Sequence, residues 1–311
     1  MISMVYKISK KLMKTYIDWL IEKYEVWGPM LAGTNYVFYK LNKGAEFKDV
    51  RTILGPKEQI YPVLEPLFKS TAKELIVMGV KSCDLKAFSM LDDVFLSGYK
   101  DENYENRRKK VHFFNFVCIE PCEYGFCTTF YGPRLEKGFE MQFTDIGNYY
   151  LIETSSTKFI NSDIEKANDA DLKAAKDKVK NVYAKMKRYD VSSLAEKLSW
   201  DNLLWKEYGE RCISCGACNY ACPTCFCFDV FEADSERFRE WDSCILSGFT
   251  RVAGNANPRI TLDLRLRQRF MHKLKFHYEN YGYYLCTGCG RCIEECPVKI
   301  DIREVIQKVK T

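Results

Sequence analysis

Two runs of cysteine in the C-terminal third of the chain share one spacing that is typical of iron–sulfur proteins. The runs are Cys212-x2-Cys215-x2-Cys218-x3-Cys222-Pro223 and Cys286-x2-Cys289-x2-Cys292-x3-Cys296-Pro297. A cubane cluster takes four thiolate ligands, three from one tight loop and the fourth from elsewhere in the chain. Zinc ribbons instead pair their cysteines two by two across a longer gap. The doubled run therefore predicts two [4Fe-4S] clusters rather than zinc.

The fourth cysteine of each run is expected to bind the cluster of the other run, as it does in two-cluster ferredoxins. The predicted ligands are Cys212, Cys215, Cys218 and Cys296 for cluster I, and Cys286, Cys289, Cys292 and Cys222 for cluster II. Gly216, Gly288 and Gly290 would allow the backbone to approach the sulfurs and direct N–H groups at them. This crossed arrangement explains why the run occurs twice.

Four further cysteines lie in the N-terminal half, near the ends of two segments that resemble strands. Cys83 follows "ELIVMGV" and Cys118 closes "VHFFNFV", with Cys122 and Cys127 shortly after. If the two strands are parallel neighbours, Cys83 and Cys118 emerge at the carboxyl edge of the sheet, where α/β proteins place their sites. We predict that the four thiols bind a third [4Fe-4S] cluster. Buried thiols, zinc and a disulfide are the alternatives.

Three cysteines in the C-terminal part belong to neither run: Cys225, Cys227 and Cys244. Three sulfurs are too few for a cubane, and reduced cysteine is commonly a small buried residue, so we expect these side chains to pack in the core. No catalytic residue is predicted. The chain has no glycine-rich phosphate loop and no G-x-G-x-x-G after a strand, and no set of acid, base and nucleophile stands out.

The composition of the 311 residues limits the class of protein. Fifteen cysteines, an odd number and mostly clustered, favour bound metal in a reducing compartment over disulfides, so we expect a cytoplasmic protein. The first twenty residues are interrupted by lysines and form no signal peptide, and no run of 18 apolar residues follows, so no membrane association is expected. The net charge of +5 indicates no strong field for nucleic acid.

Hydrophobic periodicity predicts an α/β domain followed by a mainly α-helical, ferredoxin-like domain. Helices are expected at 9–24, 84–96 and 262–282, with Gly28 and Pro29 ending the first and Gly282 capping the last. Strands are expected in "YVFYKL", "ELIVMGV", "VHFFNFVCI" and "MQFTDIGNYYLIE". The lysine- and alanine-rich residues 162–199 are interpreted as a helical connector between domains 1–161 and 200–311. Because 63 residues separate the two cysteine runs, we expect a helix-rich insert between them.

Several segments resemble the iron–sulfur subunit family that is shared by anaerobic sulfite reductase and cytoplasmic sulfhydrogenase, where it is the beta subunit. They are "GVKSCDLKAFSMLDDVFL", "RTILGPKEQIYP", "RCISCGACNYACPTCFCF", "WDSCILSGFTRVAGNANPR", "RLRQRFMHKLKF" and "LCTGCGRCIEECPVKIDI". The resemblance implies a protein that relays electrons between a catalytic subunit, which carries sirohaem or nickel–iron, and a flavin- and NAD(P)H-binding subunit. The family often has "CFC" where this chain has "GFC" at 125–127. The sequence therefore leaves open which four thiols bind the third cluster.

The leading hypothesis is therefore an electron-transfer subunit of an NAD(P)H-dependent sulfite reductase, with the nickel–iron sulfhydrogenase as the alternative. In a different class, the clusters could be structural elements of a nucleic-acid-binding protein that uses the basic run "RLRQRFMHKLK", with Arg265, Arg267, Arg269, His272 and Lys273. A third hypothesis is that the subunit itself reduces a small molecule at an exposed N-terminal cluster.

Overall fold

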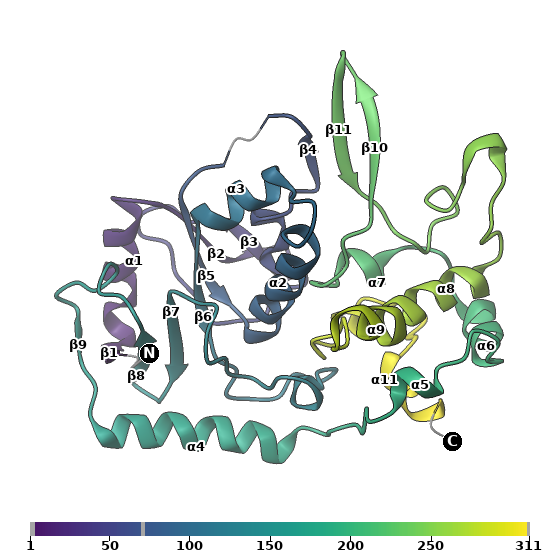
Figure 1. The fold of residues 1–311 in the computed structure, drawn as a ribbon. Coiled ribbons are helices and arrows are strands. Elements are labelled where there is room, and N and C mark those ends of the chain that lie inside the picture. The colour runs from purple at the N-terminus through teal and green to yellow at the C-terminus, as the bar shows by residue number, and fades with distance from the viewer. Residues whose placement is uncertain (1–3, 70–71, 310–311) are drawn as a thin grey trace. The chain divides into compact units, whose positions relative to one another are not determined.

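The computed structural model describes residues 4–69 and 72–309, which divide into two compact units (Figure 1). Within the described residues, unit 1 comprises 4–61, 72–121 and 131–186, and unit 2 comprises 62–69, 122–130 and 187–309. The expected boundaries at 161 and 199 followed chain order. The structure instead groups the short segments 62–69 and 122–130 with the C-terminal unit, because their contacts are made there.

Unit 1 is built on an eight-stranded mixed sheet with the order β3-β2-β5-β6-β7-β8-β1-β9. The strands are β1 (Met4–Ser9), β2 (Glu25–Ala32), β3 (Asn35–Lys40), β5 (Leu75–Val80), β6 (Val111–Phe116), β7 (Met141–Asp145), β8 (Tyr149–Thr154) and β9 (Ile164–Lys166). Neighbours among β2, β5, β6 and β7 pair in parallel, and the remaining pairs are antiparallel. The strand-like segments of the sequence thus supply most of this sheet.

The helices of unit 1 are α1 (Met13–Ile21), α2 (Ser82–Phe95), α3 (Glu102–Lys110) and α4 (Asp169–Lys185). Alternate strand residues face opposite sides of the sheet. Phe114 and Phe116 pack in a core with α1 residues such as Tyr16, whereas the ring of Phe113 lies 5.0 Å from that of Phe88 on α2. In Figure 1, α1 and α2 accordingly lie on different sides of the strands. The N-terminal unit is therefore layered, with helices covering a central sheet.

The expectation that Gly28 and Pro29 end an early helix is wrong in one respect, because both residues lie inside strand β2. The register of β2 with β5 covers only residues 25–27, so Pro29 lies beyond this pairing. On β5, Gly79 has a φ of +80° at a shift in register, and a Cβ there would lie 2.6 Å from Pro29 Cδ. A glycine bulge beside the proline therefore lets β2 run through two residues that usually break structure.

Unit 2 holds the two cysteine runs and is mainly helical, with one small sheet. Its helices are α5 (Leu194–Lys197), α6 (Leu204–Arg211), α7 (Ala217–Tyr220), α8 (Leu262–Met271), α9 (His277–Tyr281), α10 (Arg291–Glu294) and α11 (Ile302–Lys308). A π-helical segment, His272–Phe276, joins α8 to α9, and Gly282 follows α9 in the left-handed conformation. The aromatic ring of Trp205 on α6 stacks on Phe270 of α8 at 5.9 Å in the core.

The insert between the two runs contains a β-hairpin as well as the helix that the sequence predicts (Figure 1). Strands β10 (Phe228–Ala233) and β11 (Glu236–Trp241) form the hairpin, and β4 (Leu64–Pro66) pairs with β11. The Arg239 guanidinium on β11 is buried and paired with the equally buried Glu65 of β4. None of the helices among the described residues has the length and apolar character that crossing a bilayer requires.

Candidate metal centre

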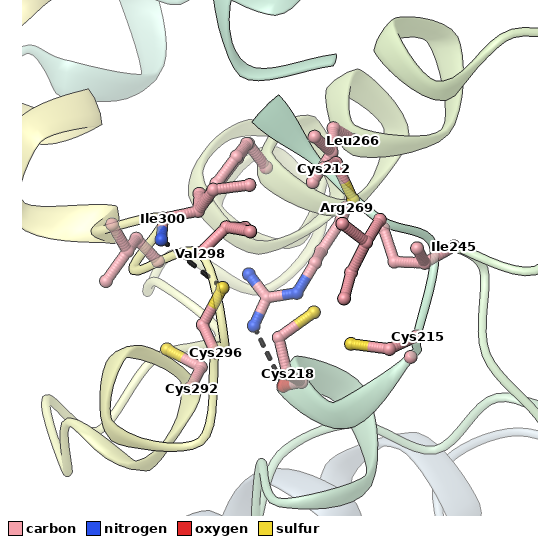
Figure 2. Close-up of a pocket in the computed structure, with 14 residues that line it drawn as sticks. Cys212, Cys215, Cys218, Ile245, Leu266, Arg269, Cys292, Cys296, Val298 and Ile300 are labelled. Atoms are coloured by element: carbon pink, nitrogen blue, oxygen red, sulfur yellow. Dashed lines mark hydrogen bonds between the residues drawn. The ribbon is translucent and has the colours of Figure 1, made fainter. Parts of the chain in front are cut away.

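The first predicted set of four cysteines lines one pocket of unit 2 (Figure 2). Cys212 and Cys215 lie between α6 and α7, Cys218 lies on α7, and Cys296 follows α10. The other lining residues are mostly apolar, among them Ile245, Leu266 and Phe270, and they also include Arg269 and Cys292 of the second run. The fourth cysteine of the second run therefore lies with the first three cysteines of the first run, in a mainly apolar setting.

The second predicted set is gathered in the same unit. Cys222 and Cys289 are buried. Burial and then the charges of Cys222, Cys289 and Cys286 raise the pKa of Cys292. Burial and the charge of Cys222 also raise the pKa of Cys286. The last cysteine of the first run thus lies beside the second run, which is the exchange that the crossed arrangement requires.

The two runs repeat one local geometry. The amide of Ser214 lies 3.4 Å from Cys212 Sγ, and in the second run the amide of Gly288 lies 3.4 Å from Cys286 Sγ. Backbone N–H groups two residues after the first cysteine therefore donate to its sulfur in both runs. A third amide, that of Ile300, donates to Cys296 Sγ at 3.3 Å (Figure 2). Such donors stabilise negative charge on a thiolate ligand.

Two buried cations, Arg269 of α8 and Lys273 of the π-helical segment, lie among the thiols. Their exposed fractions are only 3% and 2%. Arg269 donates to Asn219 Oδ1 at 2.8 Å and to the Cys218 carbonyl at 3.0 Å, the latter bond drawn in Figure 2. Lys273 Nζ donates to Cys222 Sγ at 3.2 Å. In the described part of the chain, neither side chain forms an ion pair with a carboxylate.

Burying two positive charges without a negative partner is unfavourable unless an anion shares the site. The donor set around Arg269 and Lys273 is rich in cysteine sulfur, and a [4Fe-4S] cluster with four thiolate ligands is anionic. The residues present therefore fit such clusters both in ligand type and in charge.

The pKa values of the thiols show that cluster binding must displace protons. Burial raises the pKa of Cys218 to about 11 and that of Cys286 to about 12. Cys222 differs: a hydrogen bond from the Cys225 side chain, and then the charges of Lys273 and Arg269, hold the pKa of Cys222 well below its ordinary value. Since thiolates are the ligands, binding of a cluster at Cys218 and Cys286 would release their protons.

The three cysteines outside the two runs, Cys225, Cys227 and Cys244, lie in unit 2 near the end of the first run. Cys225 is hydrogen-bonded to Cys222, and Cys227 to Cys244. Cys244 is buried and its sulfur accepts a hydrogen bond from Asn219 Nδ2 at 3.1 Å. Core packing was the expectation for all three, but only Cys244 is buried, and Cys225 and Cys227 are partly exposed. No disulfide joins any of the fifteen cysteines, all of which lie in the described residues.

The four cysteines of the predicted third cluster are divided between the units. In unit 1, Cys83 lies in the first turn of α2 and Cys118 follows β6, and β5 and β6 are parallel neighbours as expected. Cys122 and Cys127 belong to unit 2, where burial, followed by the charges of Cys122 and Cys289, raises the pKa of Cys127 to about 12. The third cluster stays a prediction.

The basic run between the cysteine runs faces inward over much of its length. Arg265, Arg269 and Lys273 are all buried. The guanidinium of Arg267 lies 3.8 Å from the centre of the Trp200 ring, and burial lowers the pKa of His272 to about 4. These side chains offer no row of exposed cations for phosphates, so the nucleic-acid alternative loses the feature on which it depended.

Comparison with known proteins gives one match over nearly the whole chain. The chain is 31% identical to sulfhydrogenase 2 subunit beta of Pyrococcus furiosus over 98% of either sequence. A shorter match, 26% identical, relates 34% of the chain to 22% of the beta subunit of the F420-dependent formate dehydrogenase of Methanocaldococcus jannaschii. Residues 211–300 match the family described as a 4Fe-4S dicluster domain. No solved structure matches the chain.

Proposed function

Because the chain belongs to the family of iron–sulfur subunits that includes the beta subunit of sulfhydrogenase 2, we propose that it is the electron-transferring subunit of a sulfhydrogenase-type complex. In this role it would pass electrons between a subunit of the nickel–iron hydrogenase type and a flavin- and NAD(P)H-binding subunit in the cytoplasm. The observation that carries the proposal is the 31% identity over 98% of the chain. On the sequence motifs alone the sulfite reductase is the leading hypothesis, and the full-length relative favours its alternative.

Two [4Fe-4S] clusters with crossed ligands are the proposed cofactors, one for each set of four cysteines described above. When bound, such clusters supply one-electron transfer without proton transfer to a substrate. The chain's own residues would hold them: the cysteines as ligands, backbone amides as donors to sulfur, and Ile245, Leu266 and Phe270 as an apolar wall beside the first set. The buried Arg269 lines the same pocket as Cys218 of the first set and Cys292 of the second.

The crossed ligands are tested with pairs of cysteine-to-alanine substitutions and the iron content per chain. Cys222 and Cys289 are proposed for the same cluster, so the double variant Cys222→Ala/Cys289→Ala should lose about four irons. Cys222 and Cys215 are proposed for different clusters, so Cys222→Ala/Cys215→Ala should lose about eight. Uncrossed ligands would give the reverse order. Cys227→Ala, which belongs to neither set and whose partner is Cys244, is the matched control and should retain the iron content of the unsubstituted chain.

The third cluster, on Cys83, Cys118, Cys122 and Cys127, is proposed on the sequence alone. The same iron measurement addresses it, because two clusters give about eight irons per chain and three give about twelve. A Cys83→Ala variant should lose about four irons if the proposal holds, and none if these thiols are only packed in the protein.

The partners are tested by purifying the intact complex through a tag on this chain and identifying the proteins that accompany it. A sulfhydrogenase-type complex should reduce NAD(P)+ with hydrogen gas as the electron source. If the complex instead oxidises NAD(P)H with sulfite and shows no activity with hydrogen, the sulfite-reducing assignment replaces this one.

A further inference from the structure

Lys273 occupies the place where the two cysteine runs approach each other. Its ammonium donates to Cys222 Sγ at 3.2 Å, to Thr224 Oγ1 at 2.8 Å and to the Leu285 carbonyl at 3.2 Å. Cys222 ends the first run, and Leu285 directly precedes Cys286, the first cysteine of the second run. One buried side chain therefore contacts the segment at the end of one run and the segment at the start of the other.

The backbone of Lys273 holds the side chain in this place. Lys273 lies in the π-helical segment His272–Phe276, and its carbonyl accepts a hydrogen bond from the Leu285 amide at 2.9 Å. A π-helical turn inside an α-helix changes the pairing of carbonyls and is frequent at functional sites. Because Leu285 is bonded to both the main chain and the side chain of Lys273, the ammonium cannot turn away from Cys222 without breaking several bonds.

The positive charge of Lys273 lies closer to the ligands of the proposed cluster II than to those of cluster I. Its sulfur partner, Cys222, belongs to the proposed cluster II, and its charge also acts on Cys286 of that cluster. Arg269, in contrast, donates a hydrogen bond to the carbonyl of Cys218, a ligand of the proposed cluster I. It also interacts electrostatically with Cys222 and Cys292 of the proposed cluster II. Arg269 is thus shared between the sets, and Lys273 adds a cation on the side of cluster II.

A cation held close to one of two redox centres stabilises the more negative, reduced state of that centre, and a buried site screens the effect little. We propose that Lys273 raises the reduction potential of cluster II, which favours the cluster of the second run as the site of a single electron that enters the domain. The step adds one electron to the cluster, forms and breaks no bond, and leaves the ammonium protonated. The inference rests on the proposed function, because it requires two clusters.

The experiment compares Lys273→Met in two single-cluster backgrounds of the full chain. By the proposed ligands, Cys215→Ala removes cluster I and leaves cluster II, and Cys289→Ala does the reverse. Iron content and the integrated EPR signal establish first that each background holds its cluster, which tests the proposed function separately. Midpoint potentials are then measured by anaerobic redox titration. In the cluster II background, Lys273→Met should shift the equilibrium at least tenfold against reduction, which is 59 mV for one electron. In the cluster I background the shift should be clearly smaller.

The matched control is Lys275→Met, two residues along the same segment. Lys275 donates to the Ala195 carbonyl at 2.7 Å and pairs with Glu279 at 3.2 Å, and within residues 4–69 and 72–309 it has no sulfur partner. Lys273→Gln keeps a hydrogen-bond donor without the charge and provides a second variant if methionine prevents assembly. Equal shifts in the two backgrounds, an equal shift from Lys275→Met, or no shift at all would overturn the proposal. Loss of cluster II in both Lys273 variants would also overturn it, because Lys273 would then be required for assembly only.

Discussion

A methyl group at Gly290 should disrupt the second cysteine run far more than the same group at Gly282. Both glycines have nearly the same left-handed φ, +77° and +78°. A Cβ on Gly282 would meet nothing within 4 Å, whereas a Cβ on Gly290 would contact the Tyr124 carbonyl oxygen and lie 2.5 Å from its carbon and 2.9 Å from the Gly125 amide nitrogen. These are backbone atoms, so no side chain can rotate to relieve the contact.

The two variants share the cost of a left-handed alanine, about 1–2 kcal/mol. Gly290→Ala adds the cost of overpacking, about 1–3 kcal/mol. In a domain of this size each kcal/mol lowers the midpoint of thermal unfolding by about 2–4 °C. Gly290→Ala should therefore unfold several degrees below Gly282→Ala, and it should also lose iron because it lies between Cys289 and Cys292. The measurements are thermal unfolding under anaerobic conditions and iron content. Equal midpoints and equal iron in the two variants would refute the packing described for residues 122–130.

Two further predictions concern pairs of charged side chains. Hydrogen bonds with Glu140 and then Glu74 raise the pKa of His112. Protonated His112 therefore adds about 1 kcal/mol to the free energy of unfolding, after allowing for its partial exposure. This stabilisation is fully present below the unfolded pKa of about 6.5 and is lost as the pH rises through the folded pKa. His112→Gln should accordingly lower the thermal midpoint at pH 6 but hardly at pH 9, and an equal loss at both would contradict this. Arg239 Nε donates to Glu65 Oε1 at 3.0 Å in a buried pair, so Arg239→Met should cost about 3–5 kcal/mol by removing the positive charge that faces the buried Glu65 carboxylate. Adding Glu65→Gln should restore much of the midpoint, and a double variant no more stable than the single one would show that the pair is not the cause.

The parts of the fold that the sequence predicts well are those with a regular pattern of apolar residues. Strand β5 is apolar throughout, and helix α2 carries its apolar residues at helical spacing over Ser82–Phe95, one or two residues from the expected bounds. Gly282 caps the long helix where expected. In these elements, local pattern and tertiary packing demand the same conformation, so local reasoning is sufficient.

The hairpin β10–β11 shows why other elements cannot be predicted from the local sequence. Its strands are rich in charge, with Glu232, Glu236 and Arg237 near the turn. The turn residues Asp234 and Ser235 adopt positive φ values of 49° and 63°, a conformation for which Asn-Gly or Asp-Gly is the usual signal. The pairing of β11 with β4 is also remote in sequence. Neither the turn nor the partner strand could be recognised from the local pattern.

The spacing of the cysteines predicts the crossed ligand sets, but it does not predict the buried cations beside them. Arg265, Arg269 and Lys273 follow one another at intervals of four residues, which places them on one face of a helix. The usual rule assigns a charged face to solvent, because unpaired Lys and Arg are rarely buried. Here the rule fails, since anionic clusters can take the place of acidic side chains as partners of the buried charge. A basic stripe at four-residue spacing on a helix between two cluster-binding runs is therefore a reason to look for cations that face the clusters. A phosphate-binding surface would instead require the same residues to lie on the solvent-exposed face of the helix.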